Sequence, residues 1–123
     1  MKNPNDSFLK GRLRSLKFAL RGAILLISTE HSIMIQVGIA IIMTIVGFVM
    51  DISATEWMFQ FLAIGLVLVA ESANTAIEKL SDFVHPDYHK RIGFIKDIAA
   101  GGPAFAAIIA VIIGFIIYLP KFS

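Results

Sequence analysis

Three long apolar stretches constrain this chain more than any other feature of its sequence. The first runs over residues 33–50 with only Gln36 and Thr44 as polar interruptions. A helix of that length measures about 27 Å, close to the ~30 Å thickness of a bilayer core. The second helix is predicted over about 54–82, apolar as far as Ala70 and polar beyond it, and the third over about 95–119. With 57% hydrophobic and 16% charged residues, the chain is predicted to be an all-α membrane protein with three transmembrane helices.

The segment before the first span is predicted to be an amphipathic helix over about 8–29. Apolar residues form one stripe along it, and a neighbouring stripe is basic: Lys10, Arg14, Lys17 and Arg21. Such helices lie in the membrane interface beside anionic headgroups. The alternative is a solvated helix packed on another domain, which is less favoured because 123 residues predict one domain over 1–123.

The basic residues predict the orientation. Ten of the eleven Lys and Arg residues precede the first span or lie between the second and third, and only Lys121 follows the third. The positive-inside rule assigns the richer side to the cytoplasm. We therefore expect the N-terminus inside and the C-terminus outside.

Local signals mark the connections. Ser53 and Glu56 form a potential capping box at the start of the second span, after a turn over 51–55. Residues 83–92 contain Pro86 and are predicted to be a loop. Pro103 is expected near the start of the third helix. Four small residues spaced by four predict close helix packing there: Gly102, Ala106, Ala110 and Gly114.

A polar helix face follows the second apolar stretch directly. Its residues recur at helical spacing: Glu71, Asn74, Thr75, Glu78 and Asp82. A carboxylate at the end of an apolar run is costly unless it has a function. Glu71 lies about 25 Å along the helix from Ala54, and Glu78 lies about 10 Å further. A base for a lipid hydroxyl and a ligand for Mg²⁺ at these depths would suit phosphoryl transfer.

Other residues on the predicted cytoplasmic side extend this candidate site. Glu30 ends the first helix, and together with Glu78 it offers two carboxylates for Mg²⁺. A second set is of the size needed to contact a nucleotide such as ATP: Asp87, Tyr88, His89, Lys96 and Asp97. Each charge taken alone is equally consistent with a solvated surface residue. His85 and His89 lack a third ligand, so a histidine metal site is not expected.

The known ATP-binding motifs of soluble kinases and phosphate-loop enzymes are absent. The sequence has no GxxxxGK[ST] phosphate loop and no Gly-rich loop, HRD or DFG motif of soluble kinases. Any chemistry on ATP must therefore use a different architecture. Cysteine is absent, so disulfides and thiolate metal sites are impossible.

The polar stretch closely resembles the bacterial DgkA-type diacylglycerol kinase family, which includes the undecaprenol kinases of Gram-positive bacteria. The matching segments are ESANTAIEKLSD over 71–82, DYH over 87–89 and GFIKD over 93–97. The resemblance extends to the surface helix, the three spans and the total length. It implies an integral lipid kinase of the bacterial inner membrane that uses MgATP, with no nucleic acid partner.

The resemblance also implies roles for residues. It implies a homotrimer whose active sites are shared between subunits at the cytoplasmic face. The matches make Glu71 the base on the lipid hydroxyl and Asn74 an active-site residue. They assign Mg²⁺ to Glu30 and Glu78, and contacts with ATP to residues 87–89 and to Lys96 and Asp97.

The N-terminal half of the nucleotide site departs from the family pattern. An arginine that contacts the nucleotide would align near Gly11, so Arg12 or Lys10 must take its place. A tyrosine of some members aligns with Phe18, which can stack on a base but cannot donate a hydrogen bond.

The expected reaction is phosphorylation of a membrane lipid alcohol, diacylglycerol to phosphatidic acid. One alternative is undecaprenol as the substrate, giving undecaprenyl phosphate. A small proton-coupled exporter is a different class, but its glutamate should lie in mid-span between polar halves. A non-catalytic assembly subunit would not need carboxylates at two matched depths.

Overall fold

The protein is built from helices. The computed structural model describes residues 4–5 and 7–122, and no strand occurs among them. The elements in chain order are α1 (Phe8–Thr29), α2 (His31–Val49), α3 (Ala54–Val84), α4 (Lys90–Tyr118) and the 3-10 helix η1 (Leu119–Phe122). Three segments are long and apolar enough to cross a membrane: α2, α3, and α4 together with η1. The predicted all-α fold class is confirmed, while the N-in/C-out orientation stays a prediction.

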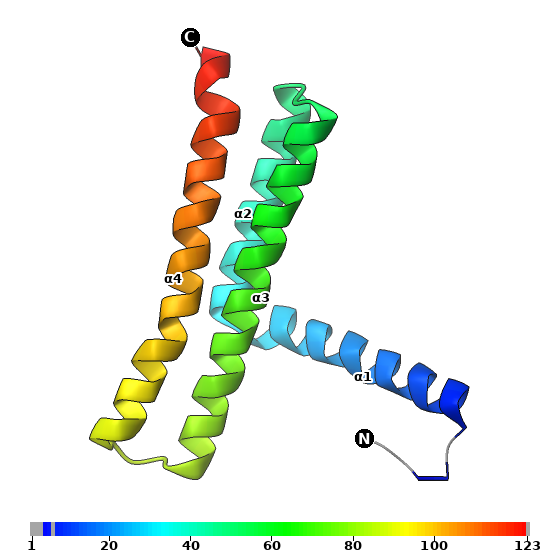
Figure 1. Cartoon of the computed structure of the whole chain (residues 1–123), viewed down its shortest axis with the longest axis vertical. Coiled ribbons are helices and arrows are strands. Elements are labelled where there is room, and N and C mark those ends of the chain that lie inside the picture. Colours follow the sequence, from blue (N-terminus) through cyan, green and yellow to red (C-terminus); the bar gives the residue numbers. More distant parts are fainter. Residues whose placement is uncertain (1–3, 6, 123) are drawn as a thin grey trace.

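The three candidate spans lie side by side, and α1 leaves them sideways (Figure 1). α3 and α4 extend beyond the start of α2, at the end where residues 85–89 connect them (Figure 1). α1 contacts the bundle through α2. Its apolar side chains, such as Leu13, Leu20 and Ile24, are exposed. α1 spans the residues expected for the surface helix, but its place at the membrane interface stays a prediction.

The turn between α2 and α3 is set by local chemistry. The Ser53 hydroxyl accepts the backbone N–H of Glu56 at 3.1 Å, and the Ser53 N–H donates to the Glu56 carboxylate at 2.9 Å. These two bonds confirm the predicted capping box. Asp51 adopts a φ of 50°, a left-handed conformation in which Asp is enriched. The chain therefore reverses within a few residues.

The start of α4 differs from the expectation. α4 begins at Lys90 rather than near 95, because the His89 ring accepts the backbone N–H of Arg91 at 3.1 Å and caps the helix. The connecting loop is therefore residues 85–89, shorter than the predicted 83–92. Pro103 lies inside α4 and not near its start, so that expectation was wrong. Proline within a membrane helix is tolerated when neighbouring groups satisfy the freed carbonyl.

The predicted small-residue stripe packs only in part. Ala106 is buried. Ala110 and Gly114 line a cavity of about 340 Å³ between α2, α3 and α4. Gly102 is exposed, and a Cβ on Gly114 would meet nothing within 4 Å, so the expected close packing is seen at Ala106 alone.

The end of the bundle that holds the α2–α3 turn and η1 is called here the Trp57 end. A Cβ on Gly47 would lie 2.6 Å from the Trp57 ring, so only glycine permits this approach of α2 to α3. Trp57 also contacts Phe48 and Phe61, with ring centroids 4.9 Å and 5.4 Å away. The turn is thus closed by tight aromatic packing.

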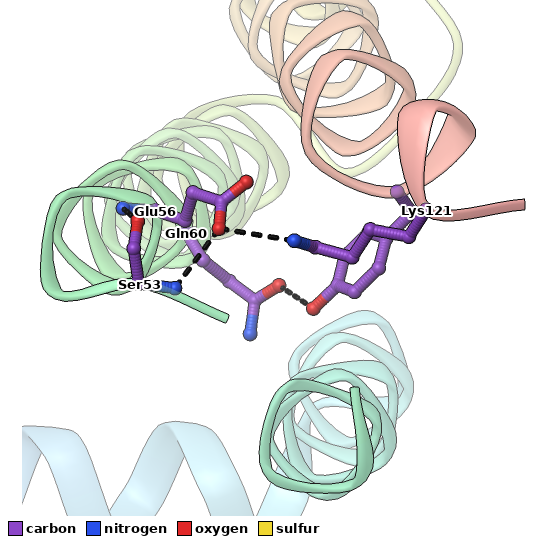
Figure 2. Close-up of polar contacts among 5 residues, drawn as sticks. Ser53, Glu56, Gln60 and Lys121 are labelled. Carbon is purple, nitrogen blue, oxygen red and sulfur yellow. Dashed lines mark hydrogen bonds and ion pairs between the residues drawn. The ribbon is translucent and has the colours of Figure 1, made fainter. Parts of the chain in front are cut away.

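A polar network joins all three spans at the Trp57 end, and Figure 2 shows the part of it that links α3 to α4 and η1. The Gln60 amide donates to the backbone carbonyl of Met43 in α2 at 2.9 Å and accepts the Tyr118 hydroxyl of α4 at 2.6 Å. Next to it, the Lys121 ammonium lies 3.2 Å from the Glu56 carboxylate. Gln60 and Tyr118 are both buried. The apolar residues on either side of Gln60 in the sequence do not indicate these partners.

Candidate active site

The polar face predicted after the second apolar stretch lies on one uninterrupted helix, α3. Along this face Thr75 is buried, whereas Glu71, Asn74 and Glu78 are partly buried and Asp82 is exposed. Asn74 donates a hydrogen bond to the Glu78 carboxylate one turn later, at 3.1 Å. The helix therefore presents Glu71 and the Asn74–Glu78 pair along one line.

Two groups on this face lack partners among the described residues. The side chain of Glu71 forms neither a hydrogen bond nor an ion pair there. The Asn74 side-chain oxygen is buried and accepts no hydrogen bond. A buried acceptor left unpaired is destabilising by about 1–3 kcal/mol. Such groups in a native fold call for an explanation, and a ligand that donates a hydrogen bond is one.

Glu30 reaches this face from the junction of α1 and α2. Its carboxylate lies 2.9 Å from the Lys79 ammonium, and Lys79 directly follows Glu78 in α3. The ion pair thus brings the α1–α2 junction to the polar face. The sequence analysis missed this partner because Lys79 and Glu30 are far apart in the chain. No group of three or more His, Cys, Asp or Glu residues within the described ranges is arranged to hold a metal ion by itself.

Lys96 of α4 forms an ion pair with α3 at the end of the bundle that holds the 85–89 loop, called here the Pro86 end. Its ammonium lies 2.6 Å from the Asp82 carboxylate. Asp97, the next residue, is exposed. Lys96 is predicted to contact ATP, and in the structure its charge is shared with Asp82.

The loop over 85–89 forms a small pocket with the ends of α3 and α4. Its volume is about 100 Å³, and its lining includes Asp82, His85, Asp87, Tyr88, His89 and Lys96. Tyr88 is 88% exposed, and Asp87 and His89 are exposed as well. The structure therefore brings the predicted loop residues together with Lys96. It adds His85, which the sequence analysis had weighed only as a metal ligand.

The two candidates on α1 lie elsewhere. Arg12 and Phe18 are exposed on a helix that points away from the bundle (Figure 1). Phe18 lines a shallow groove formed by α1 alone. Within one chain, neither residue is brought to the pocket of the 85–89 loop.

Comparison with protein families matches residues 17–118 to the family described as prokaryotic diacylglycerol kinase. The matched range includes every candidate site residue except Arg12 and its alternative Lys10. It covers α2, α3 and α4 and most of α1.

Individual relatives agree with this match. The chain is 39% identical over 93 residues to a protein named undecaprenol kinase from Bacillus subtilis, and the alignment covers 76% of each chain. It is 30% identical over 109 residues to a diacylglycerol kinase from Synechocystis, covering 88% of this chain and 62% of the relative. A diacylglycerol kinase from Escherichia coli is 31% identical over 78 residues, which are 63% of this chain and 64% of the relative.

Proposed function

This chain belongs to the prokaryotic diacylglycerol kinase family of membrane lipid kinases, and we propose that it transfers the γ-phosphoryl group of ATP to the hydroxyl of a membrane lipid alcohol. One observation carries the assignment of the site. Glu71, without a partner among the described residues, follows the apolar part of α3 on the same face as the Asn74–Glu78 pair. Lipid and nucleotide can meet at such a boundary.

Glu71 is proposed to act as the general base. Its carboxylate accepts the proton of the lipid hydroxyl as the hydroxyl oxygen bonds to the γ-phosphorus. The bond from that phosphorus to the bridging oxygen breaks, and ADP leaves with the electron pair. The unpaired oxygen of Asn74 provides an acceptor one turn from Glu71 for a donor group of the bound substrates.

Glu30 and Glu78 are proposed to hold Mg²⁺. The donor set suits this ion, which takes one or two carboxylates together with phosphate oxygens and water. One oxygen of Glu78 accepts from Asn74, and one of Glu30 pairs with Lys79, which keeps both carboxylates oriented. Bound Mg²⁺ would neutralise charge on the phosphate oxygens of ATP.

The nucleotide is proposed to bind at the Pro86 end. The 85–89 loop and Lys96 surround one pocket there, and they supply an ammonium, imidazole rings and the exposed Tyr88 ring. Lys96 can turn from Asp82 to a phosphate oxygen, because the Asp82 side chain is largely exposed and such pairs are weak. Asp97 is proposed to contact the nucleotide from the next position on α4.

Arg12 and Phe18 are proposed to complete a nucleotide site on a neighbouring copy of the chain. The direction of α1 away from its own bundle supports this, because a second subunit can meet the two side chains there (Figure 1). We propose a homotrimer with active sites shared between subunits. The proposed location is the bacterial inner membrane, with the Pro86 end at the cytoplasmic face as the basic residues predict.

We propose undecaprenol as the lipid substrate, with diacylglycerol as the second candidate. The relative at 39% identity, which aligns over 76% of each chain, is named undecaprenol kinase. The family description and two relatives at 30–31% identity support diacylglycerol.

The test is a kinase assay on purified protein in mixed micelles with MgATP. Undecaprenol and diacylglycerol are offered side by side at equal mole fraction, and labelled lipid phosphate is measured. We expect a higher kcat/KM for undecaprenol. Faster turnover of diacylglycerol would reverse the substrate order, and no product from either lipid would refute the proposed function.

A further inference from the structure

His85 is held at the base of the loop that joins α3 to α4. Its backbone N–H donates to the carbonyl of Ser81 at 2.9 Å and so ends α3. Its side chain is partly buried, while residues 86–89 are exposed. An anchored residue at the base of an exposed loop is in a position to control the shape of that loop.

The His85 ring closes the loop on itself. Its Nδ1 lies 2.7 Å from the backbone carbonyl oxygen of Asp87. A carbonyl oxygen can only accept a hydrogen bond, so this contact assigns a proton to Nδ1 of His85. The bond spans Pro86, which cannot donate a backbone hydrogen bond of its own.

His89 has the opposite arrangement. Its Nδ1 accepts the backbone N–H of Arg91 at 3.1 Å, so Nδ1 carries a lone pair and the proton of the neutral ring is on Nε2. The His85 and His89 rings pack edge to face, with centroids 5.1 Å apart and an interplanar angle of 61°. His85 thus holds the backbone of the loop directly beside His89.

We propose that His85 is a positioning residue for the nucleotide. Through its Nδ1–H it fixes the carbonyl of Asp87, and so it holds the loop backbone from which His89 can donate its Nε2–H to an oxygen of ATP. This inference rests on the proposed function, in which the loop contacts ATP. His85 itself is not required to touch the nucleotide.

The hydrogen-bond geometry distinguishes two substitutions of similar polarity. The side-chain amide nitrogen of Asn occupies nearly the place of Nδ1 of His, whereas that of Gln extends to the place of Nε2. H85N can therefore donate to the Asp87 carbonyl, and H85Q cannot without shifting the loop. Loss of one such bond corresponds to about a fivefold change in an equilibrium.

The experiment compares wild type, H85N and H85Q in mixed micelles, using the lipid that proves to be the better substrate. We expect H85Q to raise the KM for ATP about fivefold with kcat nearly unchanged, and H85N to stay within about twofold of wild type. Amide hydrogen exchange over residues 85–92 is measured on the same samples without substrate. It should be faster in H85Q and unchanged in H85N.

The two readouts separate the possible failures. Equal KM values for H85Q and wild type would overturn the positioning role, as would equal effects of H85N and H85Q. Absence of lipid phosphorylation by the wild type would refute the proposed function instead. In that case hydrogen exchange still tests the loop contact, and equal rates in all three proteins would refute it as well.

Discussion

The two ends of the helical bundle differ in whether their polar side chains are paired with one another. At the Trp57 end every polar side chain of the network has a partner, and Gln60 connects all three spans through hydrogen bonds to Met43 and Tyr118. Along α3 toward the Pro86 end, the Glu71 side chain makes no polar contact among the described residues, and the buried oxygen of Asn74 accepts no bond there. The polar groups at the Trp57 end are satisfied within the chain, whereas Glu71 and Asn74 keep oxygens that a ligand can bind.

We therefore expect the residues that stabilise the fold and those that carry activity to lie in different parts of the bundle. A buried polar group that is fully paired holds helices together in an apolar environment. A polar group left unpaired is destabilising, and it persists where binding or catalysis requires it. Substitutions at the Pro86 end should therefore change turnover more than stability, and substitutions at the Trp57 end should do the reverse.

The largest effect is expected for Glu71→Gln. The amide cannot accept the proton of the lipid hydroxyl, and loss of a general base lowers kcat by about 10²–10⁴-fold. Thermal unfolding in micelles should be unchanged or slightly shifted upward, because Glu71 forms no polar contact that the substitution would break. Turnover at the wild-type rate would disprove the base assignment.

A smaller loss is expected for Glu78→Gln. The substitution keeps an oxygen for the hydrogen bond from Asn74 and removes the charge proposed to bind Mg²⁺. The Mg²⁺ concentration for half-maximal activity should rise by at least about tenfold. Glu56→Gln is the matched control, since that carboxylate lies at the Trp57 end. If both variants respond equally to Mg²⁺, Glu78 is not a metal ligand.

Gln60→Leu tests the role of the Trp57 end in stability. Leucine fits the apolar surroundings but removes both bonds and leaves the Tyr118 hydroxyl unpaired. We expect a loss of about 1–3 kcal/mol in the free energy of unfolding, with the KM for ATP unchanged. Tyr118→Phe removes only one bond but leaves the buried Gln60 amide oxygen without its donor, and it should cost about 1 kcal/mol. A changed KM in either variant would contradict the separation of the two ends.

Much of the fold could be predicted from local sequence. The spans follow from uninterrupted apolar runs, and the capping box follows from Ser53 and Glu56 three residues apart. The position of His89 as the cap of α4 was missed, because histidine is not among the usual capping residues. The predicted loop was consequently too long.

Contacts between distant residues could not be predicted in the same way. Gln60 and Tyr118 are 58 positions apart, and nothing near either one marks them as partners. The pairing of Lys79 with Glu30 is similar. Both depend on how helices are rotated about their axes, and this is decided by packing between helices rather than by the pattern within one.

The sequence by itself determined that the chain is helical, that three segments can span a membrane and that one helix carries a polar face ending its apolar run. These properties depend on residues within a few turns of each other, so the order of residues is sufficient. Only the tertiary structure decided which groups are paired at the Trp57 end and which are left open at the Pro86 end. Pairing across helices requires side chains of separate segments to meet in space, and their spacing along the chain does not specify it.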